Sequence, residues 1–252
     1  MSVLMRHHWC RRLFIFTLIF CLMMPTAAMA LHQKDESHTN LYDCPFSMLI
    51  LGDSQMAGAG WEGGYANCIE EAYPKAHILN LAKDGSLLAN GDIQAQWELY
   101  LSEDLPMPNF VMLDGGINDL SYLKKEGFEE DGLRLVKEAL CSLIEQIHAA
   151  SPDTRIIFVL IPPLKEWEDT EKGPPSYDVQ ERYWKHMNIV ADKYNYVTVL
   201  DMFSLNPFHF PCADCYHENF SDSIHLNEAG YRNTFEYIDN ALFASLARML
   251  GE

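Results

Sequence analysis

Basic residues are scarce in this chain. Its 252 residues include 18 lysines and arginines against 36 aspartates and glutamates, which gives a formal net charge of −18 at pH 7. A surface of this sign repels the phosphates of nucleic acids and the anionic faces of membranes. We therefore expect no nucleic-acid partner, and a polyanionic substrate is disfavoured.

Long apolar runs are also scarce, and the clearest one lies at the N-terminus. Leu13–Met24 is short for a membrane span, follows three arginines, and precedes the small residues of Ala28-Met29-Ala30. This is the arrangement of a signal peptide with its cleavage site. We predict a signal peptide over residues 1–30 and a mobile tail over residues 31–45. The protein would then be periplasmic or secreted, with no stable membrane span after cleavage; an uncleaved anchor is the alternative.

Cysteine is infrequent, with seven residues in all, and two of them fall in the predicted signal peptide. Five remain, at positions 44, 68, 141, 212 and 215. Cys212-x-x-Cys215 has the spacing of a redox or zinc motif, with His217 nearby as a possible ligand. A zinc site would need a second close pair of ligands, which the sequence lacks. We therefore expect no metal and no other cofactor, and a small structural disulfide at this position.

A second disulfide is expected because an exported protein experiences oxidising conditions. Cys44 precedes the first predicted strand, and Cys68 lies in the helix that runs back toward the same end of that strand. We predict a Cys44–Cys68 bridge on this basis. Cys141, in a long predicted helix, is left as a buried thiol.

Apolar runs that alternate with helical periodicity predict one α/β domain over residues 46–252. Continuously apolar strands that alternate with helices imply a parallel sheet covered on both faces. The predicted strands are Ser47–Leu51, His77–Leu81, Phe110–Leu113, Arg155–Ile161 and Tyr196–Leu200. The predicted helices are Gly64–Ala72, Gln94–Leu101, Gly132–Ala150, one that carries Val179, Tyr183, Met187 and Val190, and one from an Asn227 N-cap to about Leu250.

Four short blocks follow predicted strands or precede the last helix. They are Gly52-Asp53-Ser54-Gln55, Gly85, Gly116-Ile117-Asn118-Asp119 and Asp222-Ser223-Ile224-His225. Each alone is typical of a turn or a cap. Ligands of parallel sheets bind beyond the carboxyl ends of the strands, where these blocks converge. Together they supply what acyl transfer needs: a nucleophile, oxyanion donors, and a base with its orienting acid.

In this order, the blocks resemble those of the SGNH (GDSL-type) hydrolase superfamily, from about Ser47 to the C-terminus. The resemblance implies a flavodoxin-like three-layer α/β/α sandwich of about five parallel strands. It implies a Ser54 nucleophile, a His225 base and an Asp222 that orients the imidazole. It also implies an oxyanion hole made by the backbone N–H groups of Ser54 and Gly85 and the Asn118 side chain. The chain has no Gly-x-Ser-x-Gly motif, which argues against the α/β-hydrolase fold.

Gln55 stands where this family often has leucine. The family pattern therefore does not tell which residues line the substrate pocket. Two long segments, Pro162–Pro175 and Met202–Ser221, are expected to wall the site. Aromatic rings in or near them either line a pocket or pack the loops onto the core. These rings are Trp61, Tyr65, Trp167, Phe203, Phe208, Phe210 and Tyr216.

The sequence therefore predicts an exported serine esterase. Its substrate is a small-molecule, lipid or glycan ester, such as a lysophospholipid or an O-acetylated glycan. The first alternative is a non-catalytic glycan- or lipid-binding module on the same fold, which would have no need of an intact Ser54, Asp222 and His225. A weaker alternative is a thiol-redox or zinc protein built on Cys212 and Cys215.

Overall fold

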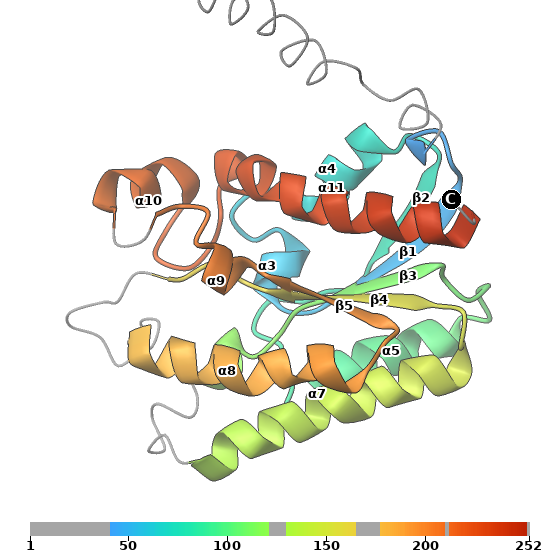
Figure 1. Cartoon of the computed structure of the whole chain (residues 1–252), viewed down its shortest axis with the longest axis horizontal. Helices are drawn as coiled ribbons and strands as arrows, with labels where there is room; N and C mark the ends of the chain where they lie inside the picture. The colour runs from blue at the N-terminus through green and yellow to red at the C-terminus, as the bar shows by residue number, and fades with distance from the viewer. Residues whose placement is uncertain (1–40, 121–129, 165–176, 210–211, 251–252) are drawn as a thin grey trace, which may run out of the picture. The chain divides into compact units, whose positions relative to one another are not determined.

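The computed structural model describes residues 41–120, 130–164, 177–209 and 212–250 (Figure 1). The predicted signal peptide and most of the predicted tail lie outside these residues. So do Trp167 and Phe210 of the predicted aromatic walls.

Five parallel strands form one sheet in the order β2-β1-β3-β4-β5. Helices cover both faces: Figure 1 shows α4 and α11 on one side and α5, α7 and α8 on the other. The predicted three-layer α/β/α sandwich is therefore confirmed. The strands are β1 (Phe46–Leu51), β2 (Ala76–Asn80), β3 (Phe110–Leu113), β4 (Arg155–Leu160) and β5 (Val197–Asp201).

Burial along the strands explains their composition. All four residues of β3 are buried, as are five of the six in β1 and in β4, because helices cover both faces of these central strands. The edge strands β2 and β5 are only partly buried and carry polar residues such as His77 and Thr198. The continuous apolar runs in the sequence are thus the centre of the sheet.

The long helices match their predicted ranges within a few residues. In α7 the predicted stripe of Leu133, Val136, Leu140, Leu143 and Ile147 is fully buried. The Oδ1 atom of Asn227 accepts from the N–H of Gly230 (3.0 Å), so the predicted N-cap of α11 is also confirmed. These helices are α4 (Gly64–Ala72), α5 (Asp92–Ser102), α7 (Glu130–Ala150), α8 (Tyr177–Lys193) and α11 (Glu228–Leu250).

Three short helices were not predicted: α3 (Ser54–Ala57), α9 (Met202–Leu205) and α10 (Ala213–Asn219). The last two divide the segment Met202–Ser221, which we had expected to be a loop. Helices of four to seven residues are too short to produce a recognisable apolar periodicity. Among the described residues, we find no helix that combines the length and the apolarity needed to cross a membrane.

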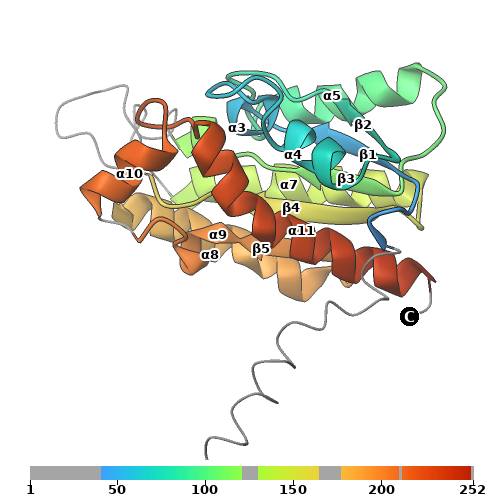
Figure 2. The same cartoon turned by 90° about the horizontal axis from the view of Figure 1, so that it is seen from above.

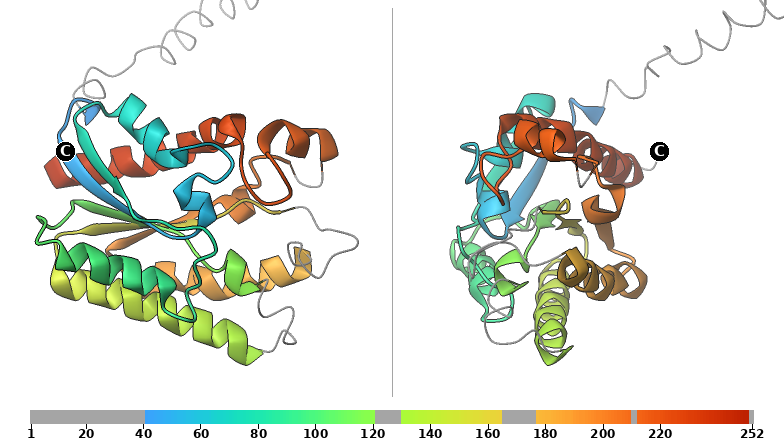
Figure 3. Two further views of the ribbon diagram at one scale, coloured as in Figure 1. Left: turned by 180° about the vertical axis from the view of Figure 1, so that it is seen from behind. Right: turned by 90° about the vertical axis from the view of Figure 1, so that its left-hand side faces the viewer.

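The carboxyl end of the sheet gathers the segments that follow the strands. Leu51 of β1 pairs with Leu113 of β3, so Gly52 and Asp114 continue side by side beyond the ladder. The short helices α3, α9 and α10 lie at this same end of the sheet in two views (Figures 2 and 3). The fold thus collects the four sequence blocks at one edge.

Candidate active site

Ser54 begins α3, directly after a tight turn at the end of β1. Gly52 has a φ of +149°, and a Cβ there would lie 2.0 Å from Asp114 Oδ1, so only glycine fits. The Asp53 side chain caps α3 by accepting from the N–H of Gln55 (3.0 Å). This turn fixes the backbone on both sides of Ser54.

The structure brings Ser54, His225 and Asp222 into one hydrogen-bonded chain. His225 Nε2 lies 2.9 Å from Ser54 Oγ, across 171 positions in the sequence. On the other side of the ring, His225 Nδ1 lies 2.7 Å from Asp222 Oδ2. This is the geometry of a nucleophile, a base and an orienting carboxylate.

Asp222 also holds its own loop. Its Oδ1 atom accepts from the N–H groups of Ile224 and His225, at 2.7 Å each. Partial burial acts to raise the pKa of Asp222, but the hydrogen bonds from His225 and Ile224 outweigh it and hold the pKa below its usual range. An ionised carboxylate only accepts, so the imidazole hydrogen lies on Nδ1. Nε2 is then left as an acceptor that faces Ser54.

The loop that carries Asp222 and His225 is braced from both ends. Phe220 and Leu226 form an antiparallel bridge, and the N–H of Ser221 donates to the carbonyl of His225 (2.9 Å). These bonds close the loop into a narrow turn and limit the freedom of the imidazole.

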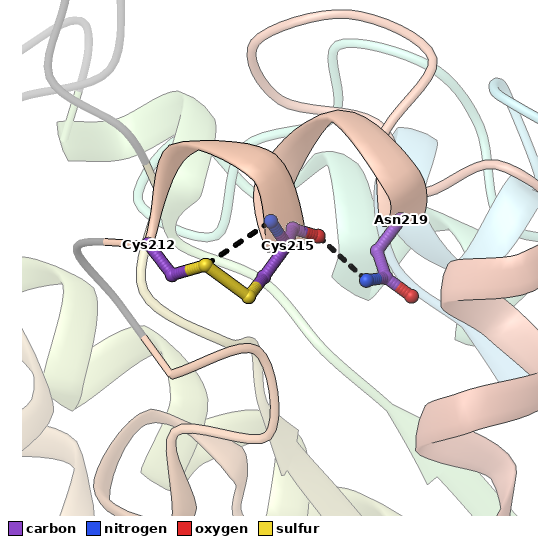
Figure 4. The surroundings of a disulfide bond; sticks show 3 residues. All are labelled: Cys212, Cys215 and Asn219. Carbon is purple, nitrogen blue, oxygen red and sulfur yellow. Dashed lines mark hydrogen bonds between the residues drawn. A yellow bond between two sulfur atoms is a disulfide. The ribbon is translucent and has the colours of Figure 1, made fainter.

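A disulfide braces the helix that leads into this loop. Cys212 and Cys215 are joined at the start of α10, which confirms the predicted bridge (Figure 4). From the same helix, the Tyr216 hydroxyl donates to the carbonyl of Asp222 (3.0 Å), and Asn219 Nδ2 donates to the carbonyl of Cys215 (2.6 Å). The disulfide therefore supports the helix that holds the Asp222 loop.

The predicted Cys44–Cys68 bridge is wrong, because both residues remain thiols. At the end of α4, Tyr73 packs against the start of β1: its ring centroid lies 5.4 Å from that of Phe46. Cys68 is five residues earlier, about 7 Å along the helix axis at a rise of ~1.5 Å per residue. It is buried instead, and this burial raises its pKa to about 11. Cys141 remains a thiol, as predicted, but it is half-buried rather than buried.

Gly85 and Asn118 lie together, as their proposed shared role requires. Gly85 is exposed with a φ of +75°, and a Cβ there would meet nothing within 4 Å, so its backbone is open to a ligand. Asn118 Nδ2 donates to the carbonyl of Ser86, the next residue (3.1 Å). A carboxamide nitrogen carries two N–H groups, and this bond uses one of them.

Asp119 holds the Gly85 loop against the end of β3. Its carboxylate accepts from the N–H groups of Leu88 (2.9 Å) and Ala89 (2.8 Å). Both polar side chains of the Gly-x-Asn-Asp block, Asn118 and Asp119, thus hold the neighbouring Gly85 loop.

Behind the nucleophile lies a buried pair of carboxyl groups, which sequence reasoning missed. The N–H of Asp53 donates to Asp114 Oδ1 (3.1 Å), and the two Oδ2 atoms have no hydrogen-bond partner among the described residues. Burial raises the pKa of Asp53 to about 7. Burial, and then the charge of Asp53, raises the pKa of Asp114 well above its usual range. Burial therefore favours the protonated form of both carboxyl groups.

Replacing Asp114 with asparagine is expected to stabilise the protein at alkaline pH. A carboxyl whose pKa is raised on folding adds stability below its unfolded pKa, near ~4, and loses it as the pH rises through the folded value. Asp114→Asn keeps an acceptor for the N–H of Asp53 and cannot ionise. Its gain in melting temperature over the wild type should be roughly 2–4 °C larger at pH 8 than at pH 5, which is about 1 kcal/mol for a domain of this size.

Thermal unfolding at the two pH values measures this difference. Asp153→Asn removes an exposed carboxyl and serves as the control, with an expected shift near zero at both values. A gain for Asp114→Asn that is equal at pH 5 and pH 8 would contradict the buried pair as the source.

A pocket of about 410 Å³, counted with its open mouth, lies beside this carboxyl pair. Phe203 lines it, in agreement with one of the two roles considered for the aromatic rings. Tyr65 does not, because its ring packs on Tyr231 (4.8 Å) and its hydroxyl pairs with that of Thr234 (2.8 Å). The lining is mostly apolar and includes Ile117, Leu120, Val159, Leu160, Ile161, Tyr183 and Trp184.

Gln55 has a structural partner and lies outside this lining. Its side chain is buried, and Nε2 donates to the carbonyl of Ile224, next to His225. Its own carbonyl accepts from the Tyr231 hydroxyl (2.7 Å). Gln55 therefore connects the turn that carries Ser54 to the loop that carries His225. The presence of glutamine in place of the family's leucine did not by itself predict this connection.

No group of three or more histidine, cysteine or acidic side chains with the geometry of a metal site occurs in the part of the chain that the structure describes. The arrangement at the carboxyl edge is one that acyl transfer uses. It contains a serine hydroxyl paired with an imidazole that a carboxylate orients.

The fold and these hydrogen bonds are those of an ester-hydrolysing enzyme. The GDSL-like lipase/acylhydrolase family model matches residues 50–232, and the chain belongs to this family. The resemblance to SGNH hydrolases seen in the sequence is thereby confirmed. No curated protein sequence was found to match the chain.

Solved structures with a similar fold include a lipase/acylhydrolase from Enterococcus faecalis, with 17% identity, a TM-score of 0.61, and coverage of 79% of this chain and 96% of that one. A catalytic mutant of Axe2, an acetylxylan esterase from Geobacillus stearothermophilus, has 16% identity and a TM-score of 0.58, covering 79% and 95%. The esterase EstA from a Pseudoalteromonas species, solved with monoethylphosphonate as inhibitor, has 18% identity and a TM-score of 0.55, covering 82% and 99%. At these identities the likeness is one of fold.

Proposed function

We propose that this protein is an exported serine esterase that cleaves carboxylic esters through an acyl-enzyme on Ser54. The observation that carries the proposal is the continuous chain from Ser54 Oγ to His225 (2.9 Å) and from His225 to Asp222 (2.7 Å). A serine hydroxyl is a weak nucleophile until a positioned base takes its proton. Here a neutral Nε2 faces the hydroxyl, and an ionised carboxylate fixes the tautomer.

In the first half-reaction, Ser54 Oγ attacks the ester carbonyl while His225 Nε2 takes the hydroxyl proton. The carbonyl oxygen becomes an oxyanion among the N–H groups of Ser54 and Gly85 and the amide of Asn118. The imidazolium then gives its proton to the departing alkoxide, and the alcohol leaves. In the second half, His225 takes a proton from water, whose oxygen attacks the acyl carbon. The bond from this carbon to Ser54 Oγ then breaks, His225 returns the proton to Oγ, and the acid leaves.

Asn118→Ala is expected to lower kcat by roughly 100- to 1,000-fold, the usual loss for one oxyanion donor. KM should change little, because the donor acts on charge that develops in the transition state. Steady-state kinetics on a soluble ester measures both constants. Asn240→Ala, at an exposed position on α11, is the control and should keep wild-type kcat. A loss below about five-fold for Asn118→Ala would argue against a role in the oxyanion hole.

The substrate class we propose is an extracytoplasmic ester: a lipid acyl ester such as a lysophospholipid, or an O-acetyl group on a glycan. The acetylxylan esterase among the similar structures supports an acyl ester without choosing its length. A panel of esters of increasing acyl length, with acetylated xylan and a lysophospholipid, separates the two. Hydrolysis of none of them would contradict the proposal.

Covalent catalysis is tested by labelling with a fluorophosphonate and mass spectrometry of the tryptic digest. We expect the label on Ser54. A non-catalytic glycan- or lipid-binding module on the same fold remains the alternative, and absence of both label and turnover would favour it.

Export is proposed from the signal-peptide pattern, and the intact mass of the mature protein tests it: a species that keeps residues 1–30 would contradict it.

A further inference from the structure

Gln96 is a buried polar side chain that bonds to two of the segments around the active site. It lies on α5 and is 8% exposed. Its Oε1 accepts from the N–H of Gly52 (2.9 Å), and its Nε2 donates to the carbonyl of Gly52 (2.8 Å) and to the Ser86 hydroxyl (3.1 Å). It thus makes three of the four hydrogen bonds that a carboxamide can form.

The two bonds to Gly52 satisfy a backbone N–H and a backbone carbonyl that have no partner within the sheet. The last pairs of β1 are Leu51 with Leu113 on one side and Ile50 with Asn80 on the other, so Gly52 lies beyond the ladder. A buried peptide group without a partner destabilises the folded state. Gln96 satisfies the N–H and shares the carbonyl with the N–H of Lys83 (3.1 Å). It therefore fixes the two peptide groups on either side of Gly52, from which the Asp53–Ser54 turn begins.

The bond to Ser86 connects the same carboxamide to the Gly85 loop. Ser86 is buried, and it uses both of its oxygens: the hydroxyl accepts from Gln96, and the carbonyl accepts from Asn118 Nδ2. One path of hydrogen bonds thus runs from the nucleophile turn through Gln96 and Ser86 to Asn118. It joins the three segments that carry the proposed oxyanion donors.

We propose that Gln96 is a positioning residue for the oxyanion hole. It holds the N–H groups of Ser54 and Gly85, and through Ser86 the amide of Asn118, at fixed mutual positions. This inference rests on the proposed function, in which those three groups stabilise the oxyanion. Such donors act only when they are aimed at the charge that develops in the transition state. Loss of Gln96 therefore lowers kcat and leaves ground-state binding almost unchanged.

Gln96→Met tests this, because methionine has a similar length and removes all three hydrogen bonds. We expect kcat, counted per active site titrated with the phosphonate, to fall by roughly 10- to 100-fold. KM should change by less than about three-fold. The acid limb of the pH–rate profile should not move, since Gln96 has no hydrogen bond to His225 or Asp222. The affinity for a trifluoromethyl ketone, whose adduct with Ser54 places an oxyanion in the hole, should fall in parallel with kcat/KM.

Thr154→Val is the matched control for lost stability. Thr154 is buried, and its hydroxyl donates to the carbonyl of Pro108 (2.7 Å), but it lies before β4, at the opposite end of the sheet. This variant should unfold more easily and keep wild-type kcat per titrated site.

Three results would overturn the positioning role of Gln96. They are a wild-type kcat in Gln96→Met, a loss accounted for by fewer titrated sites alone, and an equal loss of kcat in Thr154→Val. Failure of the proposed function looks different, because the phosphonate would then fail to label Ser54 in the wild-type protein.

Discussion

Ser54→Ala is expected to leave a folded protein with ester hydrolysis at background, a loss on the order of 10⁵- to 10⁶-fold in kcat. The substitution removes one oxygen, and the hydrogen bond that this oxygen makes in the structure is the one to His225. The turn before it is held by Gly52 and by the Asp53 cap, neither of which involves the Ser54 side chain. Catalysis is therefore lost without a structural cost.

Turnover of a soluble ester, with circular dichroism to verify the fold, measures this effect. Ser47→Ala is the matched control, because Ser47 lies at the opposite end of the same strand, where its hydroxyl accepts from the N–H of Asn109 (3.1 Å). It should keep full activity and full phosphonate labelling. Substantial turnover in Ser54→Ala, or a label on another serine, would show that the nucleophile lies elsewhere.

The centre of the sheet could be predicted closely because β1, β3 and β4 are buried on both faces. Phe110–Leu113 has the same bounds in sequence and structure, since an apolar run between polar residues leaves little choice. The other four predicted strands differ from the observed ones by a residue or two at an end. The long helices were predicted for a related reason: one buried face repeats over many turns, as in α7.

Parts of the site could not be predicted, because they depend on contacts between distant residues. In the sequence, Gln96 is an ordinary polar residue of a predicted helix, and its partner Gly52 is 44 residues away. Asp114 reads as the polar residue that ends a strand, although it is fully buried against Asp53. In the sequence, Tyr65 lies close enough to Ser54 to line a pocket, but the packing of α4 on α11 turns it into the core. The motifs in the sequence identify the four blocks of the site. The residues that hold these blocks in place are determined by tertiary packing.

Asp222→Asn should be nearly as damaging as the loss of the nucleophile, with kcat lowered by roughly 10³- to 10⁴-fold, as for orienting carboxylates of other hydrolytic triads. Asparagine keeps an oxygen that can accept from the N–H groups of Ile224 and His225, so the loop should retain its shape. The amide nitrogen that replaces Oδ2 can only donate. His225 Nδ1 would then have to accept, which places the imidazole hydrogen on Nε2. That nitrogen faces Ser54 Oγ and could no longer take its proton.

The rate of phosphonate labelling should fall together with kcat in this variant, because both reactions need the activated hydroxyl. Asp214→Asn, which removes an exposed carboxylate from α10 two residues before Tyr216, is the control for charge and should stay within about two-fold of wild type. A strong loss in both variants would point to the net charge of the loop. A loss below about ten-fold in Asp222→Asn alone would mean that the imidazole keeps its productive tautomer without the carboxylate, held by the turn between Phe220 and Leu226.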